Sequence, residues 1–297
     1  MRARRGAVTT IAVGSLLAGL AAPASATWPG TNGFIAWARA EPNSGSVTLT
    51  MNSRGTAKRS FFAGAYQARW SPDGTRIAFT HDFMDNDDVW VADPDGSNAV
   101  NLTNDPAADS QPDWSPDGQL ISFISDRNGT PSLYAMSAID GSGVVLLIDG
   151  PMSDARVDPA CTQFDCPFLY VSDVTGDQEI YFADRGFVFD ITNNPATDDS
   201  PSWSPDGLHI LFETNRDGDW EIYRMDPPFG DNPVDISNNP SQDRYPVSSP
   251  DGLRLAFASD RLDPGNMDIY TVGVNGLGPR RLTFSVAQDT TPDWEAR

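Results

Sequence analysis

The sequence predicts an all-β fold, a six-bladed β-propeller. Three observations support this: a motif that recurs at a fixed period, strand-like runs in the same order within each period, and no sustained helical pattern beyond the N-terminus. Copies of Trp-Ser-Pro-Asp-Gly begin at Trp70, Trp114 and Trp203, and a fourth copy at Ser248 has serine in place of tryptophan.

Two further positions complete the series. Pro159, in Val157-Asp158-Pro159, falls midway between Trp114 and Trp203, and Trp294 follows Pro292-Asp293 near the C-terminus. The six anchor positions, 70, 114, 159, 203, 248 and 294, are spaced by 44, 45, 44, 45 and 46 residues. So regular a spacing predicts six copies of one structural unit.

Each period has the same internal order. An apolar run such as residues 120–124 follows the Pro-Asp-Gly turn, and an aromatic run such as residues 132–135 and a short last run such as residues 99–103 come after it. With the lead-in to the anchor, each period supplies four short strands separated by turns rich in Asp, Asn, Gly and Pro. One small sheet cannot bury both of its faces, so we expect the sheets to stack as blades around an axis with their aromatic residues between them.

The two ends of the chain predict how the ring closes. Residues 33–38 and 46–51 match the second and third strands of a period, so the first period lacks its first strand. Residues 289–294 match that missing strand. We therefore expect the C-terminal strand to join the first blade, which would remove the open sheet edges.

The N-terminus predicts a secretory signal peptide over residues 1–26. Three arginines within the first five residues precede an apolar run from residue 7 to residue 22, and residues 24–26 read Ala-Ser-Ala, a small-x-small cleavage pattern. The apolar run is shorter than the roughly 20 residues of a membrane-spanning helix, so an uncleaved anchor is the less favoured alternative. We expect a secreted, extracytoplasmic propeller over residues 27–297, without membrane insertion after cleavage.

The charge limits the class of partner. Removal of residues 1–26 takes away three arginines and no acidic residue, which changes the formal net charge from −21 to −24. A chain this acidic repels nucleic acid and anionic lipid surfaces, so we expect no nucleic-acid partner. Cations, basic partners or simple solubility remain as explanations, and we expect a monomer.

The two cysteines, Cys161 and Cys166, lie five positions apart in the sequence. In an exported chain, two cysteines this close predict a local disulfide. A metal site is the weaker alternative, because two thiolates do not fill a tetrahedral shell and neither histidine lies near them in the sequence.

The turn motifs carry a family resemblance. The Ser-Pro-Asp-Gly turns, together with Leu102-Thr-Asn and Ile191-Thr-Asn-Asn-Pro195, resemble the WD40-like repeats of the TolB propeller family from Phe34 to Trp294. The resemblance implies a propeller, a fold that occurs in binding proteins, in periplasmic envelope proteins and in the non-catalytic part of peptidases. The family also has a separate N-terminal α/β domain, for which we expect no room in this chain.

Two sets of polar residues recur. An aspartate stands five residues before five of the anchors: Asp109, Asp154, Asp198, Asp243 and Asp289. In a closed ring these carboxylates would form a circle at one end of the channel. We expect each to cap its own loop by accepting backbone N–H groups, with Ca²⁺ binding as the alternative; beyond Ca²⁺ we expect no cofactor.

The second set follows the second strand of each period: Asp82, Asp126, Asp173, Asn215 and Asp260, with Arg127, Arg216 and Arg261 beside three of them. A single active site would not repeat five times. These residues therefore predict an ion pair or a turn hydrogen bond between neighbouring loops.

Catalytic motifs are absent from the sequence. There is no Gly-x-Ser-x-Gly elbow, and His81 and His209 stand alone without metal-ligand spacing. We expect no catalytic residue and a binding or scaffold module whose partner is an extracytoplasmic protein or a cell-wall polysaccharide. The alternative is a carbohydrate-active enzyme, a polysaccharide lyase or glycosidase, that draws carboxylates, Tyr or Arg from several blades at the channel mouth.

One prediction concerns export. Mass spectrometry of secreted material should find an N-terminus at Thr27 or within a residue or two of it, because the cleavage pattern ends at Ala26. An intact mass that includes Met1, recovered from a membrane fraction, would contradict the signal-peptide interpretation.

Overall fold

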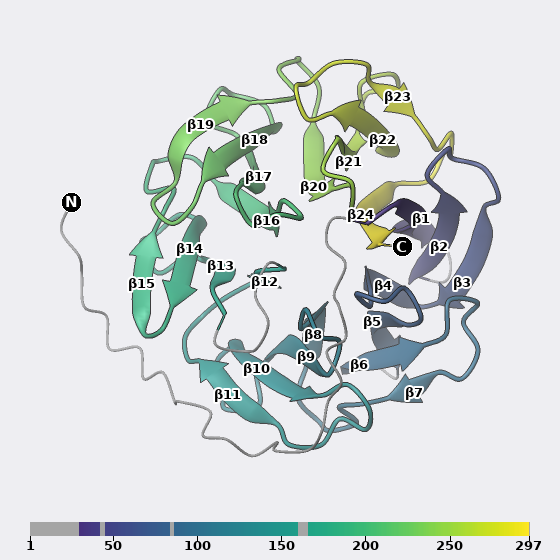
Figure 1. Ribbon diagram of the computed structural model, residues 1–297, viewed down its shortest axis with the longest axis vertical. Coiled ribbons are helices and arrows are strands. Elements are labelled where there is room, and N and C mark those ends of the chain that lie inside the picture. Colours follow the sequence, from purple (N-terminus) through teal and green to yellow (C-terminus); the bar gives the residue numbers. More distant parts are fainter. Residues whose placement is uncertain (1–29, 42–44, 84–85, 160–165, 297) are drawn as a thin grey trace.

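A computed structural model of the chain describes residues 30–41, 45–83, 86–159 and 166–296. Six antiparallel sheets of four strands surround a central channel (Figure 1). The described residues contain no helix, and so none that could span a membrane. The predicted six-bladed β-propeller is confirmed.

The strands are numbered along the chain, and within each blade they are named from the inner strand to the outer one. Blade 1 contains β24 (Asp289–Ala296), β1 (Asn32–Glu41), β2 (Gly45–Asn52) and β3 (Arg59–Ala63); blade 2 contains β4 (Ala65–Trp70), β5 (Ile77–Phe83), β6 (Asn86–Ala92) and β7 (Val100–Asn101); blade 3 contains β8 (Asp109–Trp114), β9 (Leu120–Ser125), β10 (Ser132–Ser137) and β11 (Val145–Ile148). Blade 4 contains β12 (Asp154–Val157), β13 (Phe168–Ser172), β14 (Glu179–Asp184) and β15 (Phe187–Asp190); blade 5 contains β16 (Asp198–Trp203), β17 (Ile210–Thr214), β18 (Glu221–Asp226) and β19 (Asp231–Asp235); blade 6 contains β20 (Asp243–Ser248), β21 (Arg254–Ser259), β22 (Asp268–Gly273) and β23 (Arg280–Arg281).

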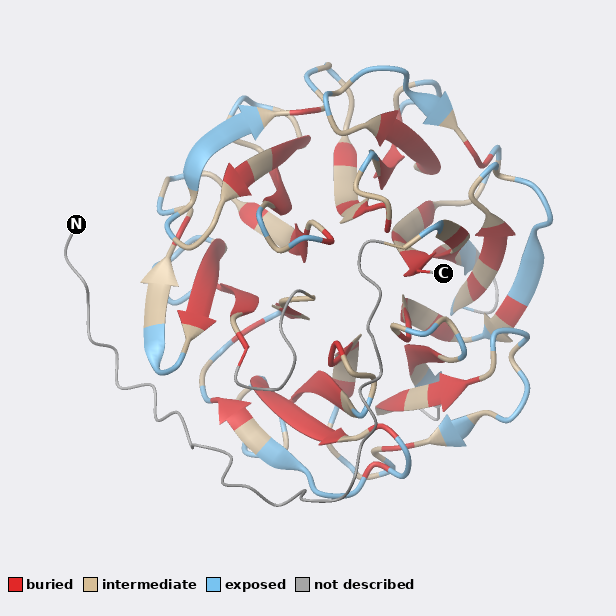
Figure 2. Cartoon of the chain, viewed as in Figure 1, coloured by how far each residue is buried: buried red, intermediate tan, exposed pale blue. Residues whose placement is uncertain are grey.

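The ring closes through its two ends. β24 pairs antiparallel with β1, with Trp294 opposite Ile35 and Asp289 opposite Arg39. The C-terminal strand thus supplies the inner strand of blade 1, as the sequence predicted. Each blade keeps two edge strands, an inner one that faces the channel and an outer one that is largely exposed (Figure 2).

The hydrophobic core lies between blades. Val89 and Val91 of blade 2 pack in one buried cluster with Trp114, Ile121 and Phe123 of blade 3, and the other blade junctions hold comparable clusters. The anchor tryptophans and the aromatic residues of the middle strands therefore fill the layers between blades, because neither face of a blade can be buried within the blade itself.

The Ser-Pro-Asp-Gly motif forms the turn between the inner and second strands. In blade 3 the Ser115 hydroxyl donates to Asp117 at 2.7 Å and accepts the Leu120 N–H at 3.0 Å, while Gly118 has a φ of 69°. Serine and aspartate satisfy the polar groups of the turn, and glycine takes the left-handed conformation that side chains disfavour.

Glycines in the turns between the third and fourth strands seal neighbouring blades. A Cβ atom on Gly141 would lie 2.0 Å from the carbonyl oxygen of Leu102, and one on Gly230 would lie 2.0 Å from that of Ile191. Each of these oxygens belongs to the preceding blade. The turn must therefore be glycine for the two backbones to approach, in addition to its positive φ.

Blade 4 departs from the repeat. Asp113 accepts the Val157 N–H at 2.9 Å, just as Asp293 accepts the Trp70 N–H at 2.8 Å, so Val157 occupies the tryptophan position. The anchor assigned to Pro159 from the spacing was wrong by two residues. β12 has four residues where most inner strands have six, because it lacks the bulge that the other inner strands contain.

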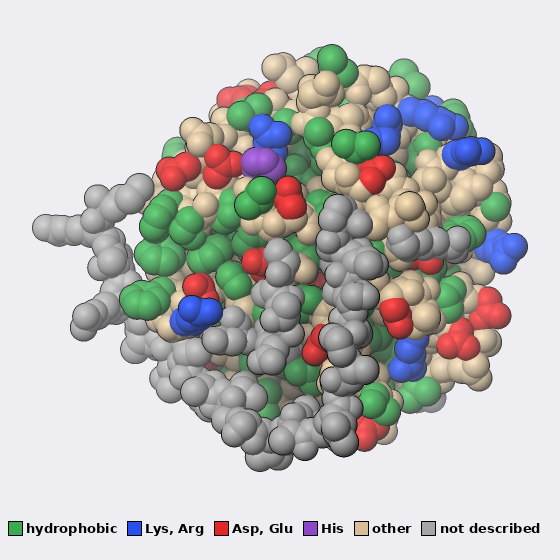
Figure 3. Space-filling view, viewed as in Figure 1, with side chains coloured by type: hydrophobic (Ala, Val, Ile, Leu, Met, Phe, Trp, Pro, Cys, Tyr) green, Lys and Arg blue, Asp and Glu red, His purple; other side chains and the backbone are tan. Residues whose placement is uncertain are grey.

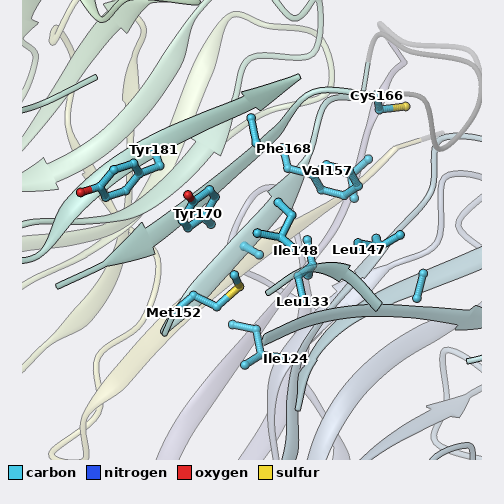
Figure 4. Close-up of a cluster of buried hydrophobic side chains, with 13 residues drawn as sticks. Ile124, Leu133, Leu147, Ile148, Met152, Val157, Cys166, Phe168, Tyr170 and Tyr181 are labelled. Atoms are coloured by element: carbon cyan, nitrogen blue, oxygen red, sulfur yellow. The ribbon is translucent and has the colours of Figure 1, made fainter. Parts of the chain in front are cut away.

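The core beside blade 4 is shown in Figure 4. Ile124 and Leu133 of blade 3 pack there with Tyr170 and Tyr181 of blade 4, and Cys166 is buried in the same cluster. Cys161 lies outside the described residues, so the predicted disulfide between Cys161 and Cys166 stays a prediction.

Removal of residues 288–297 tests ring closure. The deletion takes away β24 and the buried Trp294, and it exposes the edge of β1. We expect a loss of at least about 3 kcal/mol in the free energy of unfolding, together with aggregation. The measurement is chemical denaturation monitored by tryptophan fluorescence. An unchanged midpoint would show that the C-terminal strand does not hold the ring together.

Candidate functional site: the central channel

The five aspartates that precede the anchors all begin inner strands and are buried. We call them the ring aspartates: Asp109, Asp154, Asp198, Asp243 and Asp289. The corresponding position of blade 2 holds Ala65 at the start of β4. Together they mark one end of the channel wall.

An arginine neutralises each ring aspartate. Arg127 donates to both carboxylate oxygens of Asp109 at 2.9 and 3.1 Å, Arg261 does so to Asp243 at 3.0 and 2.8 Å, and Arg216 donates to Asp198 at 2.9 Å. Arg39 binds Asp289 at 2.7 and 2.8 Å, and Arg156 binds Asp154. The expectation that these aspartates cap their own loop backbone was wrong, apart from Asp154, which also accepts the Ala155 N–H.

The second recurrent set has the role that the sequence predicted for three of its members. Asp126 accepts the Ala108 N–H at 3.0 Å, Asn215 accepts the Thr197 N–H at 3.0 Å and Asp260 accepts the Gln242 N–H at 2.9 Å. Each bond joins the loop after a second strand to the loop before the inner strand of the same blade. The arginines beside these three residues are those that bind the ring aspartates.

The same arginines lie over aromatic pairs. The Arg127 guanidinium is 5.1 Å from the ring centre of Phe123 and 5.0 Å from that of Tyr134, and Arg216 and Arg261 repeat the arrangement in blades 5 and 6. A guanidinium on an aromatic face gains a cation–π interaction while its edge remains free for a carboxylate. The Asp–Arg–aromatic stack is therefore a repeated structural unit.

Blade 4 keeps the aromatic pair without the arginine. Val174 stands at the arginine position, and Tyr170 and Tyr181 stack with ring centres 5.2 Å apart. Met152 lies beside this pair (Figure 4), at a position where blades 3 and 5 have alanine. Valine thus stands where blades 3, 5 and 6 have the stacking arginine, and Asp154 relies on Arg156 instead.

Five inner strands contain a bulge with a left-handed residue that is not glycine. These residues are Gln67, Gln111, Ser200, Tyr245 and Thr291, with φ between 46° and 58°. The strand pairing shifts register at each of them. A bulge re-aims side chains, and left-handed backbone costs free energy in residues other than glycine. All five residues line the channel.

A neighbouring blade accepts the backbone N–H of two of these left-handed residues. The Gln111 N–H is donated to the Gln67 side-chain oxygen at 3.1 Å and the Tyr245 N–H to Glu213 at 2.6 Å. In four of the five strands a proline follows the left-handed residue. Proline has no N–H and is tolerated at a bulge, so the X-Pro-x-Trp lead-in is the sequence signal that could have revealed these bulges.

Charges alternate around part of the channel. The residue before the tryptophan position is Asp293 in blade 1, Arg69 in blade 2, Asp113 in blade 3 and Arg156 in blade 4. Burial raises the pKa of Asp113 and of Asp293, and the two arginines oppose that rise. Sequence reasoning missed this belt, although Arg69, Asp113 and Asp293 stand directly before their tryptophan anchors.

The wall of blades 5 and 6 holds a second charged group. Arg244 donates to Glu213 at 2.9 Å and lies over the Trp220 ring, 4.2 Å from its centre. Burial raises the pKa of Glu213 to about 7. Asp199 accepts the Ser200 N–H at 2.7 Å and forms no ion pair with another described residue; burial and then the Asp154 charge raise its pKa.

These groups surround one cavity of about 510 Å³ along the channel. Its wall and the contacts behind it combine five carboxylates, Asp113, Asp154, Asp199, Glu213 and Asp293, with three arginines, Arg69, Arg156 and Arg244. The channel wall is therefore polar and acidic in balance. Among the described residues neither histidine lines the cavity. Its charged and polar side chains include carboxylates, arginines, tyrosines and glutamines.

The described residues form no group of three or more His, Cys, Asp or Glu side chains that could hold a metal ion. The ring aspartates point to five different arginines and share none. Calcium binding at Asp109, Asp154, Asp198, Asp243 and Asp289 stays the alternative hypothesis, which thermal melts in calcium, in chelator and in sodium chloride of matched ionic strength will test. A midpoint that rises with calcium alone would establish the cation site.

Asp243→Asn tests the Asp–Arg–aromatic stack. The substitution removes the buried carboxylate at the start of β20 and leaves the Arg261 guanidinium without its ion-pair partner. We therefore expect a loss of about 3 kcal/mol in the free energy of unfolding. Asp231→Asn, at an exposed position on β19, is the matched control and should change it by less than about 0.5 kcal/mol. Equal losses in the free energy of unfolding of the two variants would show that the stack does not stabilise the fold.

Glu221 offers a pH test in the same fold. It begins β18 and accepts hydrogen bonds from the Ser237 hydroxyl and the Asn239 N–H, and burial raises its pKa to about 7. The folded chain then keeps a proton on Glu221 up to about pH 7, whereas the unfolded chain releases it near pH 4.5. Glu221 therefore lowers the free energy of unfolding as the pH rises from about 4.5 to about 7.

Glu221→Gln should remove this contribution. Its denaturation midpoint should rise relative to the native chain between about pH 5 and about pH 8, because glutamine stays neutral. Asp231→Asn again serves as the control. A difference between variant and native chain that stays constant over this range would contradict the pKa assignment.

Comparison with known proteins agrees with this geometry. The family model of the TolB beta propeller domain matches residues 17–162. The Tol-Pal system protein TolB of Anaeromyxobacter dehalogenans is 49% identical over 55 residues, which cover 18% of this chain and 12% of that protein. An uncharacterized protein of Agrobacterium fabrum is 30% identical over 159 residues, which cover 50% of this chain and 54% of the relative.

The TolB crystal structure from Acinetobacter baumannii superposes with a TM-score of 0.77 at 20% identity, covering 89% of this chain and 67% of that one. At that identity the likeness shows the fold alone. The sequence matches span about a tenth to a half of the curated relatives. Together with six four-stranded blades closed by β24, these findings show that the chain is a TolB-like β-propeller.

Proposed function

We propose that this protein is an exported binding propeller that engages an extracytoplasmic protein or a cell-wall polymer at its central channel. The observation that carries the proposal is the set of five inner-strand bulges, whose left-handed residues line the cavity. Left-handed conformations cost roughly 1 kcal/mol or more each, and five of them in one wall favour a function over stability alone.

The charge of the channel supports the same proposal. Five carboxylates share three arginines, and Asp199 has no ion-pair partner among the described residues. A balance of this kind disfavours anionic ligands and suits a ligand segment that brings hydrogen-bond donors or a cationic group. The signal-like N-terminus and the name of the relatives, Tol-Pal system protein TolB, support an extracytoplasmic location.

A specific observation favours the second candidate, a carbohydrate-active enzyme. Glu213, Arg244, Tyr245 and Asp199 meet at one side of the channel, and the pKa of Glu213 is raised to about 7, near the range of a general acid. Glu213 is fully buried behind Arg244, however, which places it out of reach of a ligand in this conformation.

The test blocks the channel without touching its charges. Ser153 is exposed and lines the cavity, so Ser153→Trp should obstruct the mouth. We expect affinity capture from cell-envelope extract to recover a partner with the native chain and to lose at least about nine-tenths of it with Ser153→Trp. Ser142→Trp, in an exposed turn of blade 3 outside the channel, should capture normally.

Retention of the partner by Ser153→Trp would exclude the channel as the binding site. A polysaccharide turnover screen of the native chain and of Asp199→Asn separates the two candidates. Turnover that falls with Asp199→Asn would favour the enzyme, and capture without turnover would favour the binding module.

A further inference from the structure

Five cationic side chains gather on the outer rim where blades 1 and 6 meet. We call this surface the basic rim: Arg54, Lys58 and Arg59 from blade 1, and Arg280 and Arg281 from blade 6. Arg280 donates to the Arg54 carbonyl oxygen at 2.8 Å, which joins the two blades. Figure 3 shows Lys and Arg side chains gathered on one part of the rim, and Figure 1 places β23 and β3 there.

The chain segments that form this surface lack acidic residues. Neither residues 42–72 nor residues 269–288 contain an aspartate or a glutamate, in a chain with 41 of them. Arg281 pairs with Asp268, whereas the other four basic side chains take part in none of the ion pairs formed by the described residues. All four are exposed. The basic rim is thus a positive surface on a strongly negative protein.

Phe284 holds two of the cations together. Its ring centre lies 5.9 Å from the Lys58 ammonium and 4.8 Å from the Arg281 guanidinium. The ring is 72% exposed, so it adds cation–π stabilisation without burying the charges. Mutual repulsion would otherwise separate these groups, and an exposed aromatic ring that gathers cations pre-organises them for an anion.

We propose that the basic rim binds a linear polyanion, a polymer that carries phosphate or carboxylate groups along its chain. The cations extend along a convex edge from the turn before β3 to β23, which fits an extended chain lying across the rim. Four of the five are arginines, whose planar guanidinium binds phosphate and carboxylate through paired hydrogen bonds. The site is separate from the channel and does not depend on its function.

An anionic membrane surface fits the observations less well. Membrane-surface binding pairs basic residues with apolar side chains that insert between lipids. On this rim the Phe284 ring is engaged with two cations, which leaves Val286 as the exposed apolar side chain of the same loop. The net charge of −21 also repels an extended anionic surface more than it repels a single polymer chain at one edge.

The test measures binding of the full mature chain to fluorescent polyphosphate and polygalacturonate at about 20 mM salt, by anisotropy. The variant Lys58→Glu/Arg280→Glu should lose at least about tenfold in affinity, and the slope of log K against log salt should fall by about two. The matched control Arg185→Glu/Arg224→Glu changes the charge equally on blades 4 and 5, outside the basic rim, and should lose less than about twofold.

Binding of polyphosphate alone identifies a phosphate polymer, and binding of polygalacturonate alone identifies a carboxylate polymer; dependence of either on Lys58 and Arg280 supports the proposal. The thermal midpoints of both double variants must match that of the native chain. If Lys58→Glu/Arg280→Glu melts at a lower temperature, the charge-neutralising variant Lys58→Gln/Arg280→Gln replaces it. Failure of both polymers to bind overturns the proposal. Equal losses in the two double variants overturn it, as does binding to vesicles of anionic lipid without binding to either polymer.

Discussion

The whole structure depends on burial between neighbouring blades. A four-stranded sheet has two apolar faces and no means of covering them, so each blade is stable only against the blades on either side. Trp114 and Phe123 illustrate the constraint, because they complete a cluster that begins on Val89 and Val91 of the preceding blade. Ring closure by β24 is the last such contact, and without it two blade faces and a sheet edge would meet water.

Close contact of the blades imposes demands on the backbone and on buried charge. Gly141 and Gly230 allow one turn to approach the carbonyl oxygen of the preceding blade. The ring aspartates begin the inner strands, where burial is nearly complete, and each is bound by an arginine. In blades 3, 5 and 6 that arginine also rests on an aromatic pair, so charge neutralisation and core packing use the same side chain.

Blade 4 shows which parts of the repeat can be replaced. Its inner strand lacks the bulge, and valine replaces both the anchor tryptophan and the stacking arginine. Met152 fills space beside Tyr170 and Tyr181, and Arg156 binds Asp154 from the channel side. The same arginine thereby contributes to the alternating belt with Asp113 and Arg69. The departure from the repeat thus places positive charge in the same channel wall as Asp199, which has no ion pair within the described part of the chain.

The sequence by itself determined the class of fold, the number of blades and the way the ring closes. The repeating unit must bury its faces against copies of itself, which sets the period of the sequence. The repeat is visible as the Ser-Pro-Asp-Gly turn in four of the six blades and as the aromatic runs of the middle strands. It also predicted the loop bonds of Asp126, Asn215 and Asp260, because their recurrence argued for structure.

Only the tertiary structure decided which groups meet in the channel and on the rim. Asp293 and Arg69 are 224 positions apart in the sequence and stand on neighbouring blades, and Arg54 meets Arg280 across the closure of the ring. A single sequence does not reveal such pairings, because the position of a side chain around the axis depends on bulges and on blade twist. The misplaced anchor at Pro159 has this cause: a missing bulge shortened the inner strand by two residues, and the period alone did not register it.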